Sequence, residues 1–233
     1  GDNFLAGPEW NCGTQNGVPF LDSVALTEIG FDAFCLGNHD FDFGPDVLAQ
    51  FIEGVANGAP FLSANLDFSA EANLAALEAA GRIAPSTVVE VGGRQIGIVG
   101  ATTPNLPSIS SPGDVVVDPD VRAAVQAQID ALLADGVDIV ILTSHLQSIG
   151  EDLALIPTLS GVDIAIAGGG DDLLANPGTP LLPGDEAVGP YPAIATDADG
   201  RTVPVVSVSG NYGYPGRLQV EFDAADRRQR AIR

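Results

Sequence analysis

The chain has 233 residues, 45% of them apolar, which suits one large α/β domain or two small ones with a full hydrophobic core. Its formal net charge is −22, and all nine of its basic residues are arginines. Such an acidic surface repels nucleic-acid backbones and anionic lipids, so the composition argues against a sequence-independent nucleic-acid binder. No stretch reaches the roughly 18 consecutive apolar residues of a membrane-spanning helix, and the N-terminus shows no signal-peptide core.

The N-terminal residues bear on how the chain arises. It contains no methionine and begins directly with Gly1-Asp2-Asn3. We therefore expect a processed or excised piece of a longer protein, with a strand missing in front of this motif. The two cysteines, Cys12 and Cys35, belong to no CxxC pattern, which disfavours a cysteine-based metal or redox site. Cys35 lies in an apolar run and is expected to be buried.

Strand-like and helix-like stretches alternate along the N-terminal half. A Gly- and Asn-rich loop up to Gly17 precedes the first predicted helix, which Gly30 ends. Pro45 suits the first position of a second helix, and Gly92-Gly93 between two β-rich runs predicts a hairpin. The predicted helices here are 20–29 and 46–55, and the predicted strands are 31–36, 60–66, 87–91 and 95–100.

The C-terminal half continues this alternation. Val121, Val125, Ile129 and Leu132 recur at helical spacing, so they are expected on the inner face of one helix. A Pro- and Gly-rich stretch at 176–192 interrupts the pattern before the last strands. The predicted helices are 118–133 and 151–159, and the predicted strands are 137–142, 162–167, 203–208 and 217–222.

Polar clusters follow three of the apolar strands. In open α/β sheets ligands bind at the carboxyl ends of strands, so these clusters are candidate functional residues. With Gly1-Asp2 at the chain start, four clusters could converge on one edge of the sheet. The other three are 37–42, 144–145 and 168–172.

Both histidines of the chain, His39 and His145, fall in these clusters. One histidine at a strand end is usually a hydrogen-bonded loop residue, but two in that position favour a functional site. Imidazole, carboxylate and amide oxygen together suit Zn, Mn or Fe, and a bridging carboxylate supports a two-metal site.

Three motifs carry a family resemblance. Gly1-Asp2-Asn3, the Gly-Asn-His-Asp-Phe-Asp-Phe-Gly run at 37–44 and Thr-Ser-His-Leu at 143–146 resemble the calcineurin-like metallophosphoesterases, and within them the 5′-nucleotidase branch. The stretches 61–66 and 98–104 are also similar to that branch. The resemblance implies a mixed β-sheet sandwich flanked by helices, with the catalytic domain at 1–225 and a tail or linker at 226–233.

The resemblance also implies roles for individual residues. Asp2 matches the carboxylate that bridges both metals, and Asn38 and His145 match ligands of the second metal. His39 matches the histidine that faces the substrate phosphate, and Asp42 the carboxylate that orients it. For Asp2 and Asn38 the alternative is simple turn formation.

Two departures from the family pattern concern the first metal. The family's Asp-x-His motif on an N-terminal strand is absent. Its last motif, Gly-His-x-His or Gly-His-x-Gln, falls where this chain has Gly170 for one histidine and Asp172 for the terminal ligand. Asp172 could bind the first metal as an oxygen donor. Alternatively, Asp171 and Asp172 only cap the following 173–174 stretch.

The implied activity is hydrolysis of phosphate monoesters, nucleotides in particular, by in-line attack at phosphorus between two divalent metal ions. A degenerate binding or structural module with the same fold is the alternative. In 5′-nucleotidases a separate C-terminal domain holds the nucleoside, and we expect that domain to be missing here. We also expect poor hydrolysis by this chain alone, and a secreted or periplasmic location.

Overall fold

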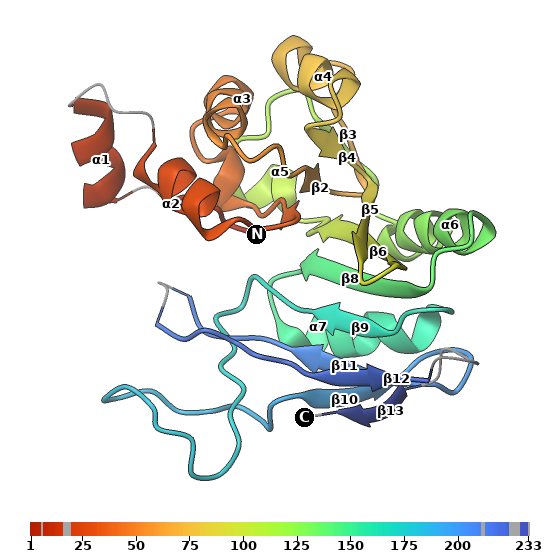
Figure 1. The fold of residues 1–233 in the computed structure, drawn as a ribbon. Coiled ribbons are helices and arrows are strands. Elements are labelled where there is room, and N and C mark those ends of the chain that lie inside the picture. The colour runs from red at the N-terminus through yellow and green to blue at the C-terminus, as the bar shows by residue number, and fades with distance from the viewer. Residues whose placement is uncertain (6, 16–19, 211–212, 224–228, 233) are drawn as a thin grey trace. The chain divides into compact units, whose positions relative to one another are not determined.

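The computed structural model describes residues 1–5, 7–15, 20–210, 213–223 and 229–232 (Figure 1). They form two compact units. The first comprises Gly1–Thr87 and Val99–Val125, and the second comprises Val88–Ile98 and Gln126–Arg233. Among the described residues, no helix combines the length and apolar character that crossing a bilayer would require.

The first unit contains the predicted N-terminal helices. α2 spans Leu21–Ile29 and ends at Gly30, whose φ of 77° is readily adopted only by glycine, as predicted. α3 spans Pro45–Gly54 with proline in its first turn. α3 buries one face of apolar side chains in the core, namely Leu48, Ala49, Phe51 and Ile52.

Short strands build the rest of this unit. β1 (Phe34–Cys35), β2 (Phe61–Leu62) and β4 (Ile83–Ala84) form a parallel sheet in the order β1-β2-β4. β3 (Leu66–Asp67) pairs antiparallel with β7 (Val116–Val117). α4 (Ala72–Ala79) and α5 (Leu106–Ile109) complete the unit. Strands are much shorter than predicted because only two residues of each pair with a neighbour.

One prediction for this unit is wrong. Part of the loop expected up to Gly17 forms α1, Pro8–Gln15. Asn11 and Gly13 are poor helix formers, so propensity alone would not predict a helix here. Trp10 on α1 stacks on Phe4 and Phe43, with ring centroids 5.2 and 4.5 Å apart. This aromatic packing outweighs the weak local propensity.

The second unit is organised by a six-stranded mixed sheet in the order β10-β11-β9-β8-β6-β5. β8, β9 and β11 are parallel, and β10 pairs antiparallel with β11. β6 begins in this unit and ends in the first. The strands are β5 (Ser86–Val91), β6 (Arg94–Thr102), β8 (Ile139–His145), β9 (Ile164–Ile166), β10 (Ala193–Thr196) and β11 (Thr202–Val206).

The hairpin and the long helix predicted for this region are confirmed. Gly92 and Gly93 join β5 to β6, and their φ values of 60° and 77° are those of a tight hairpin turn. α6 (Val121–Ala134) buries its predicted apolar stripe. It lies so close to β6 that a Cβ at Gly97 would be 2.8 Å from a methyl group of Leu132.

Shorter elements follow β8. α7 (Ile149–Leu155) continues into a 3-10 helix, η2 (Ile156–Thr158), over the segment predicted as one helix. Near the end of the chain, β12 (Val220–Phe222) pairs with β13 (Gln229–Ile232). Part of the segment expected to be a tail is therefore a strand, because β12 offers its backbone groups for pairing. The mixed sheet with its flanking helices makes this an α/β protein.

Candidate active site

In the first unit, the loop after β1 is held as one turn of 3-10 helix, η1 (His39–Phe41). The backbone N–H groups of Phe41 and Asp42 donate to the carbonyl oxygens of Asn38 and His39, each at 3.1 Å. Phe41 is fully buried and anchors the turn in the core. The apolar anchor leaves the polar side chains on either side of it to form the site.

Asp2 lies beside this loop, as predicted. Its Oδ1 accepts a hydrogen bond from the backbone N–H of His39 at 2.9 Å. Asp2 has a φ of 57°, a left-handed conformation that aspartate tolerates better than most residues. The structure therefore brings the predicted bridging carboxylate next to Asn38 and His39, and Asn38 itself is buried.

A second carboxylate, Asp40, fixes the Asp2 segment and was missed in the sequence. Asp40 is fully buried, and it accepts from the backbone and side-chain N–H groups of Asn3 at 2.7 and 2.9 Å. It also accepts from the N–H of Gly37 at 2.8 Å. Burial raises the pKa of Asp40 to about 6, and the charge of Asp2 adds to this effect. The place of Asp40 in the Gly-Asn-His-Asp run at 37–40 was the available signal.

His39 and Asp42 form a pair on the surface of the loop. Nδ1 of His39 lies 2.6 Å from Oδ2 of Asp42, and the hydroxyl of Ser110 donates to Oδ1 of Asp42 at 3.0 Å. Burial lowers the pKa of His39, but the hydrogen bond to Asp42 and the charge of Asp2 outweigh it, so the net pKa is raised. The His39 side chain remains 45% exposed, which leaves it accessible to a ligand.

In the second unit, His145 is the last residue of β8 and is only 2% exposed. Its ring lies against the glycine-rich loop that follows β9. A Cβ at Gly168 would be 3.5 Å from Nδ1 of His145, and a Cβ at Gly169 would be 3.2 Å from its Cδ2. The N–H of Leu146 donates to the carbonyl of Gly168 at 3.2 Å, so two strand ends meet here.

The two aspartates of that loop bind backbone amides. Oδ2 of Asp172 accepts from the N–H of Ile149 at 2.8 Å, and Oδ1 of Asp171 accepts from the N–H of Gly210 at 2.9 Å. Neither partner lies in the 173–174 stretch that they were alternatively expected to cap. Asp172 instead fixes the start of α7.

Gly170, where the family has a histidine, packs closely on the preceding turn. A Cβ at Gly170 would lie 2.8 Å from the carbonyl oxygen of Gln147 and 2.9 Å from Cα of Ser148. Real Cβ atoms do not approach backbone atoms this closely. The local backbone therefore excludes a side chain at this position unless the turn moves.

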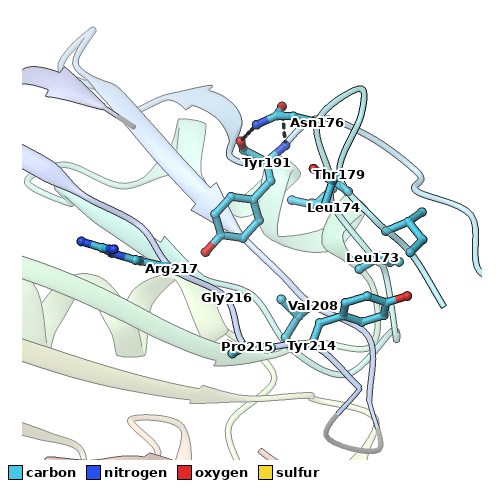
Figure 2. A pocket seen from close by; sticks show the side chains of 12 residues that line it. Leu173, Leu174, Asn176, Thr179, Tyr191, Val208, Tyr214, Pro215, Gly216 and Arg217 are labelled. Carbon is cyan, nitrogen blue, oxygen red and sulfur yellow. Dashed lines mark hydrogen bonds between the residues drawn. The ribbon is translucent and has the colours of Figure 1, made fainter.

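Leu173, the residue after Asp172, lines a pocket of about 190 Å³ (Figure 2). Asn176 holds Tyr191 beside it, because its Nδ2 donates to the carbonyl of Tyr191 at 2.6 Å and its Oδ1 accepts the N–H of Tyr191 at 3.3 Å. Apolar side chains and the two rings of Tyr191 and Tyr214 provide most of the lining. None of the predicted site residues lines this pocket.

The donor types suit a divalent metal. The first unit offers a carboxylate and an amide oxygen, and the second offers an imidazole and a carboxylate, which are ligands for Zn, Mn or Fe. Among the described residues, no group of three or more His, Cys, Asp or Glu side chains is arranged to hold an ion.

Comparisons with known proteins give one consistent result, although no family model matches the chain. The 5′-nucleotidase of Diplobatis ommata is 36% identical over 202 residues, covering 86% of this chain and 34% of that protein. The Homo sapiens 5′-nucleotidase is 35% identical over 200 residues, covering 85% and 33%. The chain thus spans about a third of the length of these curated relatives.

Solved structures agree. A 5′-nucleotidase precursor from Thermus thermophilus is 35% identical with a TM-score of 0.78, covering 91% of this chain and 39% of that one. The NAD nucleotidase of Haemophilus influenzae is 28% identical with a TM-score of 0.78, covering 91% and 40%. A calcineurin-like phosphoesterase from Bacillus subtilis, 19% identical with a TM-score of 0.60, shares the fold. The chain therefore belongs to the 5′-nucleotidase family, and its fold is that of the calcineurin-like phosphoesterases.

Proposed function

We propose that the protein hydrolyses phosphate monoesters of nucleotides with the help of two divalent metal ions. The observation that carries the proposal is the 37–42 loop. There an accessible histidine is oriented by a carboxylate at 2.6 Å, next to Asp2, in a chain of the 5′-nucleotidase family. This is the arrangement of a group that hydrogen-bonds a phosphate ester, with its partner fixing the ring.

Asp2, Asn38, His145 and Asp172 are the proposed metal ligands. When bound, divalent cations would stabilise charge on the phosphoryl oxygens and activate water. The chain's own contribution is positioning. Asp42 holds Nδ1 of His39, so the opposite ring nitrogen is free to donate to the substrate phosphate or the leaving oxygen.

The test is phosphate release from a nucleoside monophosphate and from p-nitrophenyl phosphate. We expect turnover with Mn²⁺ or Zn²⁺ that is slow for this chain alone, loss of turnover in excess chelator, and recovery when metal is returned. A 2′,3′-cyclic nucleotide in the same panel separates phosphomonoesterase from phosphodiesterase activity. Turnover that persists unchanged in chelator would contradict a metal-dependent hydrolase.

A second candidate is a module that keeps the fold without catalysis. It is favoured by the close packing at Gly170 and by the backbone hydrogen bonds of Asp171 and Asp172. Metal analysis distinguishes the two: the enzyme should hold two ions per chain, and the non-catalytic module fewer. A secreted or periplasmic location is part of the proposal, supported by relatives such as the snake venom 5′-nucleotidase of Naja atra.

A further inference from the structure

A buried hydrogen-bonded pair, Ser144 and Asp152, adjoins His145 in the chain. Ser144 precedes His145 on β8, and Asp152 is on α7. The hydroxyl of Ser144 donates to Oδ1 of Asp152. The same hydroxyl lies 3.4 Å from the carbonyl oxygen of Ile166, the last residue of β9. One hydroxyl therefore connects both strand ends with the helix between them.

An aspartate is unusual in this buried position on α7. It is 0% exposed, and its Oδ2 has no hydrogen-bond partner among the described residues. A charged carboxylate with one oxygen unsatisfied is costly to bury, and a neutral carboxyl costs less. Burial raises the pKa of Asp152 to about 7, although the hydrogen bond from Ser144 acts in the opposite direction.

The charged neighbours act in the same direction as burial. Glu151 on α7 and Asp172 after β9 both raise the pKa of Asp152. On β8 the adjacent titratable residue is His145, and the segments η2 and β9 contain none. The carboxyl of Asp152 therefore binds a proton readily in the folded chain.

Ser144 can serve both protonation states. With Asp152 ionised, the Ser144 hydroxyl donates to its Oδ1. With Asp152 protonated, Oδ1–H can donate to Oγ of Ser144, whose own hydrogen then turns to the carbonyl of Ile166. The second arrangement uses every donor and links α7, β8 and β9 in one chain of hydrogen bonds. The difference between the two states is one proton exchanged with solvent.

We propose that Ser144 and Asp152 are positioning residues for His145, and that a single proton on Asp152 locks the two strand ends that carry His145 and the glycine loop. When Asp152 is protonated the two strand ends are held together, and when it is ionised they separate more readily. The inference concerns the conformation of these strand ends. Only its importance for metal binding rests on the proposed function, so the experiment below uses no metal and no substrate.

The test is amide hydrogen exchange at Leu146, whose N–H donates to the carbonyl of Gly168. If the opening that lets the Leu146 amide exchange also exposes Asp152, the protection factor of Leu146 should fall about tenfold per pH unit up to about pH 7 and then level off. This holds after correction for intrinsic exchange. In Asp152→Asn the protection should become independent of pH. Glu151→Gln removes a neighbouring charge that raises the pKa of Asp152, so the fall in protection should persist but level off at a slightly lower pH.

A second measurement separates positioning from mere stabilisation. The two histidines give two imidazole Cε1–H resonances, which His39→Gln assigns. At pH 8.5 Asp152→Asn and Ser144→Ala should each shift the His145 resonance and leave that of His39 in place. Unchanged pH dependence at Leu146 in Asp152→Asn, or an unshifted His145 resonance in both variants, would overturn the proposal.

Discussion

At the scale of single residues, His39 and Asp42 are the groups best placed for chemistry. Asp42 is itself held by Ser110, so the imidazole is fixed through two successive hydrogen bonds. His145 differs in being buried at a strand end. Exposure thus separates the proposed reacting histidine from the proposed ligand histidine.

Substitution of the two histidines should separate these roles. His39→Ala should lower turnover by roughly 10²- to 10⁴-fold while metal content stays near that of the original protein. His145→Ala should instead remove bound metal. Steady-state kinetics and metal analysis on the same preparations provide the comparison, and equal metal loss in both variants would show that His39 is a ligand.

Asp40→Asn should weaken the first unit. Three N–H groups donate to the Asp40 carboxylate, so an amide NH₂ would face at least one of them. We expect a loss of about 1–3 kcal/mol in the free energy of unfolding, measured by urea titration. Asp135→Asn removes an exposed carboxylate and is the matched control. Equal stability of the two variants would mean that Asp40 does not hold the Asp2 segment.

At the scale of elements, the strand ends with their polar clusters could be read from the sequence. Apolar runs before Gly37, Ser144 and Gly168 indicated strands, and the clusters after them are where the structure places the candidate residues. Helix α1 could not be predicted, because it is stabilised by the packing of Trp10 on Phe4 and Phe43. Asp40 and Asp152 were missed because burial of a carboxylate depends on partners distant in the sequence.

Gly170→His tests whether the family histidine can be restored. The Gln147–Ser148 backbone leaves no room for a Cβ, so the substitution should cost about 1–3 kcal/mol of unfolding free energy. Metal affinity should not rise unless this turn shifts. Thermal unfolding and metal titration check both points, with Gly213→His as the control, since a Cβ there would meet no atom closer than 3.6 Å. A stable variant with tighter metal binding would contradict the steric argument.

At the scale of the whole molecule, the net charge affects the stability of the folded state. A net charge of −22 produces repulsion in the folded chain, which salt screens. We expect the melting temperature at pH 7 to rise as NaCl increases from low concentration to about 1 M, since the Debye length falls to about 3 Å there. Calorimetry provides the measurement. A melting temperature that stays constant or falls would exclude charge repulsion as the main effect of salt on stability.

The buried carboxylates give stability a defined pH dependence. Folding raises the pKa of Asp40 to about 6 and of Asp152 to about 7, from 3.8. The folded state therefore binds more protons than the unfolded state in this range, and its stability falls as pH rises from about 4 to about 7. Urea titrations across this range should show the decline, and Asp152→Asn should reduce it. A stability maximum at pH 8 would contradict both assignments.

The aromatic stack of Phe4, Trp10 and Phe43 has a practical consequence. Trp10 is the only tryptophan of the chain, and its ring lies nearly parallel to that of Phe43, at 9°. Phe4 is two residues from Asp2, and Phe43 follows Asp42. The tryptophan fluorescence of the protein therefore comes from a single indole whose surroundings include the two segments that present these carboxylates. A cation that draws Asp2 towards itself should change the intensity or wavelength of that emission, so metal binding can be followed without a label.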